Sequence, residues 1–187
     1  MNREEALSLL KENISKENLI KHMLSVEAIM KGCAEFLKEN GEDVDVEKWR
    51  FLGIIHDIDF EKAPEPEKHC TVAPEILQGK VDEEIIRGIK AHNFEHLDVQ
   101  PQSKMEYCLI AADAVSGLII AAALIVPSKK LADVKVKSIK KKFKQKDFAR
   151  NCRRDLILYC EKIGIPKEKF FEISLKALQE ISNELGL

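Results

Sequence analysis

The sequence lacks any Cys-x-x-Cys pair, and its five cysteines are an odd number. This pattern argues against a thiolate zinc site and against a disulfide framework, so a reducing, cytoplasmic environment fits best. The formal net charge of −2 is small and gives no overall argument for binding to nucleic acid or to a membrane. Because the N-terminus carries acidic residues and no apolar run, we expect no secretory signal.

Proline and glycine are also scarce, with six and eight in 187 residues, which leaves room for long helices. No stretch alternates convincingly between apolar and polar residues, so no sheet is predicted. The apolar run Cys108–Val126 is long enough to cross a bilayer. It contains Asp113 and six alanines, however, and we interpret it as the buried central helix of a soluble bundle. The predicted fold is all-α, in a single structural domain.

Apolar residues recur at three- and four-residue spacing along most of the chain, which predicts amphipathic helices. Their expected caps are Ser15, Asp45, Asp82 and the Ser103–Glu106 capping box, with Pro166 in the first turn of the last helix. The expected helices are 4–12, 15–40, one through 49–59, a short segment 71–78, one from 83 through 92, 103–126, 153–163 and 166–185.

The composition changes at Lys129. From Lys129 to Arg154, twelve Lys or Arg residues stand against Asp133 and Asp147, an excess of ten positive charges (12 − 2). A thin apolar seam predicts that this segment is helical. The chain is therefore divided into a helical core, 1–128, and a basic helical extension, 129–187, packed on it. A solvated helix face is the slightly favoured interpretation of the basic residues, and a positive rim that attracts phosphorylated ligands is the alternative.

Histidines and aspartates fall beside the apolar stripes of several predicted helices. One such residue alone is explained by a hydrogen bond to a neighbour, but a set of them fits a metal site assembled from facing helices. Imidazole and carboxylate ligands suit one or two divalent ions such as Mn²⁺, Fe²⁺, Co²⁺, Ni²⁺ or Zn²⁺; Mg²⁺ prefers oxygen ligands and is less favoured. The candidate ligands are His22, His56, Asp57, His69, His92 and Asp113, while His96 is expected at the surface.

The order of His22, His56-Asp57 and Asp113 resembles the H…HD…D signature of the HD-domain superfamily of metal-dependent phosphohydrolases. His56-Asp57-Ile58-Asp59 is also similar to the motif of the HDIG subgroup, and the stretches that begin at His69 and end at His92 are similar to two further motifs of that subgroup. The resemblance spans about residues 19–126. It implies an HD-domain helical bundle with a helical C-terminal extension.

The resemblance also implies the roles of the ligands. His22, His56, Asp57 and Asp113 would bind a first metal, His69 and His92 would hold a second, and Asp57 would bridge the pair. The sequence departs from the subgroup where Asp59 replaces the glycine of HDIG, where Phe60 replaces a frequent lysine, and where Asn93 replaces a second histidine. These departures argue against a cyclic-dinucleotide phosphodiesterase.

The implied reaction is attack of a metal-bound hydroxide on phosphorus, in a nucleotide or another small phosphorylated metabolite, by a phosphomonoesterase or a phosphodiesterase. Asp57 would lie at the reacting centre. Asp59 and Glu61 are candidates to orient the water or to protonate the leaving group, although an exposed acidic patch explains them equally well. Lys62, or Lys129 and the residue after it, would stabilise charge on the phosphate oxygens.

Three other functions remain open from the sequence. One is a catalytically idle HD-like module that binds a nucleotide or a protein partner, although an intact ligand set argues against it. Another is a di-iron oxygenase of HD type. The third is a nucleic-acid binder that works through Lys129–Arg154, which is less favoured than a small phosphorylated substrate. No membrane partner is expected, and nothing in the sequence indicates an oligomeric state.

Overall fold

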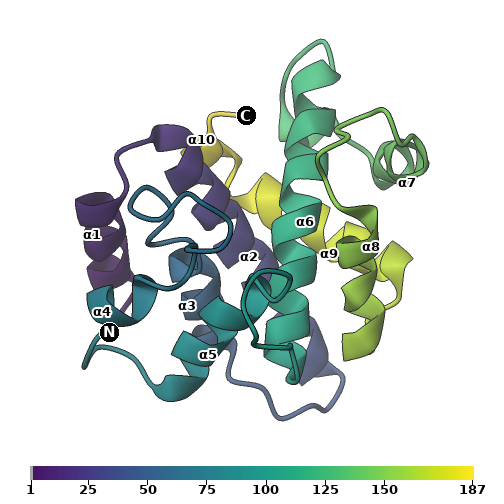
Figure 1. The fold of residues 1–187 in the computed structure, drawn as a ribbon. Coiled ribbons are helices and arrows are strands. Elements are labelled where there is room, and N and C mark those ends of the chain that lie inside the picture. The colour runs from purple at the N-terminus through teal and green to yellow at the C-terminus, as the bar shows by residue number, and fades with distance from the viewer. Residues whose placement is uncertain (1) are drawn as a thin grey trace.

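A computed structural model describes residues 2–187 and shows helices and no strand in that range, which confirms the all-α prediction. The helices are α1 (Arg3–Asn13), α2 (Glu17–Glu39), α3 (Val46–Ile55), α4 (Ala73–Ile76), α5 (Glu83–His92), α6 (Lys104–Ile125), α7 (Val136–Lys144), α8 (Arg154–Ile157), α9 (Lys167–Glu180) and α10 (Ser182–Leu185), with 3₁₀ turns η1 (Leu131–Asp133) and η2 (Leu158–Ile163). Figure 1 shows α6 in the middle of the molecule, with α1, α3 and α4 on one side and α7 and α8 on the other.

Three helices begin at the predicted capping residues. The side chains of Asp45 and Asp82 accept the backbone N–H of the third helical residue, and Ser103 forms a reciprocal capping box with Glu106. The prediction for Ser15 is wrong. α2 begins at Glu17 after Lys16, which makes no side-chain cap, because the Ser15 hydroxyl donates to Glu61 instead.

Three of the predicted helices end or break earlier than expected. α3 ends at Ile55 rather than at Asp59, because turns follow His56 directly. The predicted helix 153–163 is a short α8 continued by the 3₁₀ turn η2. The predicted helix 166–185 breaks at Ile181, and Pro166 lies at its N-cap rather than in its first turn.

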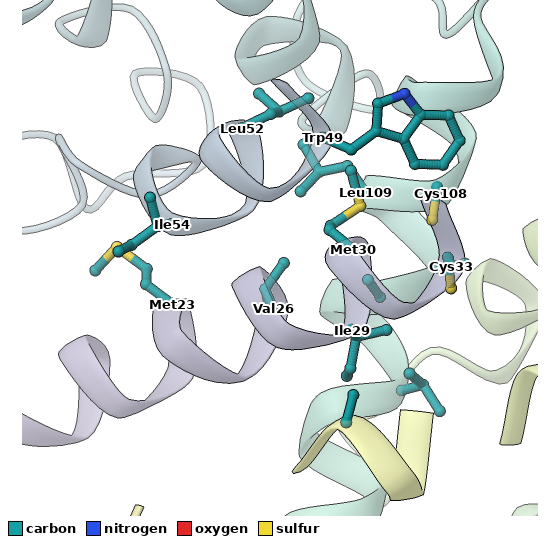
Figure 2. Close-up of a cluster of buried hydrophobic side chains, with 14 of the residues drawn as sticks. Met23, Val26, Ile29, Met30, Cys33, Trp49, Leu52, Ile54, Cys108 and Leu109 are labelled. Carbon is teal, nitrogen blue, oxygen red and sulfur yellow. The ribbon is translucent and has the colours of Figure 1, made fainter. Parts of the chain in front are cut away.

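The core lies where α2 passes between α3, α6 and α9. Helix α6 is the one helix among residues 2–187 that is long and apolar enough to cross a membrane by length and composition, and most of it is buried inside the protein. This burial agrees with its predicted place at the centre of a bundle. Figure 2 shows the contact of α2 with α3 and α6, made by Met23, Val26, Ile29, Met30 and Cys33 against Trp49, Leu52, Ile54, Cys108 and Leu109.

Helices α2 and α3 come closest at Gly53. A Cβ added at this position would lie 2.9 Å from the Glu27 Cα and 3.0 Å from the Val26 carbonyl oxygen. Glycine is a poor helix former, by about 1 kcal/mol relative to alanine. Its presence in the middle of α3 is therefore explained by the close approach of the two backbones.

A buried ion-pair network lies beside this crossing. The Glu27 side chain is buried, and its carboxylate accepts hydrogen bonds from Arg3 Nε at 2.6 Å and from Arg50 Nε at 2.8 Å. Two guanidinium groups that stay charged at any physiological pH thus neutralise one buried carboxylate. The network joins α1, α2 and α3.

The C-terminal part of the chain packs on the same core. Phe170 and Phe171 of α9 are fully buried, and Ile139 of α7 is buried with them. Gln179 of α9 donates to the carbonyl oxygen of Leu131 at 2.9 Å, which holds η1 in place. The basic segment Lys129–Arg154 is therefore ordered in part as the helix α7, as the apolar seam predicts, and otherwise as turns.

Candidate metal centre

Six predicted ligands from five parts of the chain meet at one place. His22 is in the first half of α2, His56 caps the C-terminus of α3, and Asp57 follows it directly. His69 lies in the turn before α4, His92 is the last residue of α5, and Asp113 is in the middle of α6. His96 lies at the surface, as expected.

Asp57 is at the centre of this cluster. Its Oδ1 atom lies 3.1 Å from His69 Nε2, 3.2 Å from His92 Nε2 and 3.4 Å from His56 Nε2. Its Oδ2 atom lies 3.7 Å from His22 Nε2, which is itself 3.1 Å from Asp113 Oδ1. One oxygen of the Asp57 carboxylate therefore faces three imidazoles, and the other faces a fourth, which contacts Asp113.

The histidine rings are oriented by contacts on the side away from Asp57. His56 Nδ1 donates to the Gly53 carbonyl oxygen at 2.8 Å, and His92 Nδ1 donates to the Ile89 carbonyl oxygen at 2.5 Å. His22 Nδ1 lies 3.3 Å from the Ser116 hydroxyl. A hydrogen bond at Nδ1 fixes the ring and directs Nε2 inward, which is the arrangement that metal-ligating histidines adopt.

The inward nitrogen of His56 has no hydrogen-bond partner although it is fully buried. A buried polar atom without a partner is unfavourable by about 1–3 kcal/mol. The atom faces Asp57 and the other rings rather than a donor. A cation between these atoms would supply the missing partner, so the residues present fit a bound metal.

The spacing of the inward atoms agrees with this fit. His69 Nε2 and His92 Nε2 are 3.2 Å apart, and both are at nearly the same distance from Asp57 Oδ1. Atoms that share one ion at about 2.0–2.2 Å are roughly 3 Å from one another. Three groups of potential ligand atoms lie within 4.8 Å of one another: His22, His56 and Asp113; His56, Asp57 and His92; and His69, Cys70 and His92.

The cluster is open to solvent on the side of α2 and α6. The side chains of Asp113 and His22 are 38% and 26% exposed, whereas His56, Asp57, His69 and His92 are at most 12% exposed. A ligand can therefore approach next to Asp113. The rest of the cluster is enclosed by protein, which strengthens electrostatic interactions there.

The cluster shifts the pKa values of its members in opposite directions. Burial opposes ionisation of Asp57, but the surrounding His56, His69 and His92 rings outweigh it and hold its pKa well below its usual range. Burial lowers the pKa of His56 to about 4. Burial also opposes a proton on His69, but the contacts with Asp57 and Asp59 raise its pKa to about 12. Without a metal, a proton on His69 thus compensates the charge of Asp57.

Asp59 supports the cluster from behind. It is fully buried, and its carboxylate accepts the backbone N–H groups of Cys70, Val72 and Ala73 at 3.2, 3.0 and 2.9 Å. Its Oδ1 atom also lies 3.3 Å from His69 Nδ1, on the side of the ring opposite Asp57. These contacts correct the predicted role: both oxygens are occupied, so Asp59 positions His69 and does not reach a water or a leaving group.

Glu61 and Lys62 lie outside the cluster. The Glu61 carboxylate accepts hydrogen bonds from the backbone of Ser15 and Lys16, and Lys62 Nζ donates to the Asn13 side chain at 2.5 Å. Both residues thus join the turn after α3 to the connection between α1 and α2. Their predicted catalytic roles have no support in these contacts, and neither residue belongs to the site proposed below.

Two neighbours of the cluster were not predicted. Ser116 donates to the Asp113 carbonyl oxygen at 2.8 Å and faces His22 from α6, and its place three residues after Asp113 was the available signal. Cys70 is fully buried with a positive φ of 72°, and its sulfur lies 3.6 Å from His92 Nδ1. No spacing pattern distinguishes a single cysteine of this kind from a core residue.

A helical protein with buried histidines and aspartates around one central carboxylate belongs, by its chemistry, to the metal-binding proteins. The HD domain family matches residues 19–118, and the chain belongs to this family. HD domains bind divalent metals and are generally metal-dependent phosphohydrolases. The matched range contains all six predicted ligands, and it ends before the basic segment.

Two relatives show more limited similarity. Over 78 residues the chain is 40% identical to an uncharacterized protein of Methanocaldococcus jannaschii, a match that covers 42% of this chain and 45% of that protein. Over 76 residues it is 32% identical to ribonuclease Y 2 of Bdellovibrio bacteriovorus, a match that covers 40% of this chain and 14% of that protein. The matches thus span less than half of either relative. No solved structure matches the chain significantly.

Proposed function

We propose that this protein is a hydrolase of phosphate esters that depends on a divalent metal. The observation that carries the proposal is the set of inward-facing atoms around Asp57, in which His56 Nε2 is buried without a partner. The proposed ligands of a first ion are His22, His56, Asp57 and Asp113. The proposed ligands of a second ion are Asp57, His69 and His92.

The metal would lower the pKa of a bound water and polarise the phosphate group. Asp57 Oδ2 lies near His22 of the first proposed set of ligands, and Oδ1 lies near His69 of the second. One carboxylate would thus belong to both sets. Gly53, Ile89 and Ser116 fix the rings of His56, His92 and His22 through Nδ1, which leaves each Nε2 directed inward. The enclosed side of the cluster excludes bulk water from the reacting group.

The proposed substrates are nucleotides or other small phosphorylated metabolites. The similarity to ribonuclease Y 2 supports including phosphodiesters beside phosphomonoesters. A divalent ion with borderline character, among Mn²⁺, Fe²⁺, Co²⁺, Ni²⁺ and Zn²⁺, suits the mixed imidazole and carboxylate ligands.

The test compares the parent protein with His56→Ala and Asp57→Asn. Metal content after purification is measured by mass spectrometry, and hydrolysis is measured on a panel of phosphomonoesters and phosphodiesters with each metal added in turn. We expect metal in the parent, little in the variants, and phosphate-ester hydrolysis in the parent alone. Full metal content and activity in both variants would overturn the site.

The same panel separates the competing functions. Oxygen consumption without hydrolysis would favour a di-iron oxygenase. Nucleotide binding without turnover of any substrate, with every metal added, would favour an idle binding module. In both cases the proposed reaction would be wrong, and the measured metal content would decide separately whether the metal site is correct.

A further inference from the structure

The basic segment Lys129–Arg154 gathers many unpaired positive charges in a short stretch of the chain. Among the described residues 2–187, none of the ten Lys and Arg residues from Lys129 to Arg150 forms an ion pair, and Arg153 is the first basic residue of the segment that does. Lysines elsewhere on the surface do form such pairs, as Lys31 does with Glu35 and Lys176 with Glu180. Unpaired cations gathered in one segment attract anions.

The basic segment packs its apolar side on the core and exposes most of its basic side chains to solvent. Ile139 of α7 is buried, and the Phe143 ring lies 5.4 Å from the Phe171 ring of α9, so the apolar side of α7 is used against the core. After α7, the Arg154 guanidinium donates to the carbonyl oxygens of Ala149 and Cys152 at 2.5 and 2.6 Å and also contacts Phe148 and Gln145. The exposed basic side chains include Lys135, Lys137, Lys141, Lys144, Lys146 and Arg150.

The end of the segment adjoins the open side of the metal centre. Cys152 packs on α6 at Gly117, where an added Cβ would lie 3.0 Å from its sulfur. Gly117 is four residues after Asp113 and therefore on the same face of the helix, about 6 Å along its axis. The loop between α7 and α8, which carries Cys152, runs beside α6 (Figure 1). A polymer with repeated negative charges, bound along the basic segment, would therefore reach the exposed side of Asp113.

We propose that the basic segment binds the phosphate backbone of a single-stranded nucleic acid and directs it to the metal centre. The inference rests on the proposed function for the reaction and names a substrate class for it. The cations extend beyond one nucleotide: the nine residues of α7 cover about 14 Å, the length of about four phosphates of one strand. A single strand bends readily, so it can turn one phosphate into a recessed site that a stiff duplex cannot enter.

The use of the apolar face of α7 argues against a membrane as the partner. An interfacial helix buries its apolar side in lipid, whereas that side of α7 packs on the protein. The exposed apolar side chains nearest in sequence are Leu124 and Ile125 at the end of α6, with 51% and 56% exposure. Anionic vesicles are therefore one arm of the test.

The test measures binding of fluorescently labelled 20-nucleotide RNA, DNA and duplex DNA by anisotropy between 50 and 200 mM salt (roughly the range in which phosphate contacts are lost). The variant is Lys137→Gln, Lys141→Gln and Lys144→Gln in one protein. The matched control, Lys31→Gln, Lys169→Gln and Lys176→Gln, has the same change of charge in the groove between α2 and α9. The three α7 lysines, Lys169 and Lys176 are exposed, and the Lys31 side chain is 42% exposed.

We expect the parent to bind single strands more tightly than the duplex, with affinity that falls steeply with salt. The α7 variant should bind single strands at least tenfold more weakly, and its salt slope should decrease by about 2 for three lost phosphate contacts. The control should stay within about twofold of the parent. The inference is wrong if the parent does not retain single strands at 50 mM salt, if the control loses as much affinity, or if only phosphatidylserine vesicles are bound.

A small chromogenic phosphodiester separates this inference from the proposed reaction, because it is too short to reach α7. Hydrolysis of this substrate should be unchanged in the α7 variant and lost in Asp57→Asn. Normal hydrolysis without strand binding would leave the reaction intact and end the inference. Strand binding without hydrolysis of any phosphate ester would leave the surface intact and end the proposed reaction.

Discussion

Glu27 and Asp57 are both buried carboxylates, with 4% and 8% exposure, but their neighbours differ in kind. Glu27 is bound by Arg3 and Arg50, whose charge does not depend on pH. Asp57 is surrounded by imidazoles, which are neutral unless they take up a proton. The charge of the first carboxylate is neutralised within the protein at any physiological pH, whereas the charge of the second is neutralised only when its imidazoles bind a proton or a metal ion. A structural ion pair and a candidate metal site are distinguished by this difference.

The sharpest test of the comparison is Asp57→Asn against Glu27→Gln, since each replaces a carboxylate by an amide of similar size. Asp57→Asn should abolish metal binding at the proposed bridging position and reduce kcat/KM by about a thousandfold or more, because the proposed metal would supply both an activated water and charge stabilisation. Metal analysis and steady-state kinetics check this outcome. Retained metal at parental stoichiometry would show that Asp57 is not the bridge.

Asp59→Asn should have the next largest effect. The amide cannot accept all three backbone N–H groups, so the loop that carries His69 loses part of its support although no proposed ligand is itself replaced. Changes to such supporting residues reduce metal affinity by about 10- to 100-fold. Metal titration by calorimetry measures the change, with Lys62→Gln as the control that should leave affinity within about twofold. Equal affinity in Asp59→Asn and the parent would contradict the positioning role.

Glu27→Gln should affect stability and not the metal. It leaves two guanidinium groups with a weaker partner, and we expect a loss of about 2 kcal/mol in the free energy of unfolding. Urea denaturation measures this loss in the presence of the metal, and mass spectrometry should find the parental metal content in the folded variant. If Glu27→Gln kept the parental stability but lost its metal, Glu27 would act on the metal site and not as a structural ion pair.

The comparison also predicts that metal affinity at the Asp57 cluster depends on pH, whereas the Glu27 ion pairs do not. Burial opposes a proton on His69, but Asp57 and Asp59 raise its pKa to about 12, so the metal-free protein holds this proton at neutral pH. A metal at Nε2 must displace it, and metal binding should therefore release protons and become about tenfold stronger per pH unit for each proton released. Calorimetry in buffers with different ionisation enthalpies counts the protons. Affinity that does not change between pH 6 and 8 (roughly the accessible range) would argue against His69 as a ligand.

The sequence predicted most of the helices because their caps are local patterns, and it predicted which histidines and aspartates meet at Asp57 because their order resembles a known family. The caps at Asp45, Asp82 and Ser103 act within three residues, and the ligands come in an order that resembles a known family. The failures depend on contacts that are distant in sequence. The Ser15 hydroxyl donates to Glu61, which is 46 residues further along the chain. The backbone N–H groups that engage Asp59 lie 11–14 residues after it, so nothing in the sequence indicated its positioning role.

Gly53 has a consequence for the metal site although it is not one of its residues. A Cβ added to Gly53 would meet the α2 backbone at Glu27, and the Gly53 carbonyl oxygen accepts a hydrogen bond from the His56 ring. One residue thus sets both the distance between two helices and the direction of a candidate ligand. Adding a single methyl group in Gly53→Ala would force α3 away from α2 and move the His56 anchor with it. The distance between α2 and α3 is thereby linked to the affinity of the proposed metal centre. A packing change in the core should therefore change metal binding.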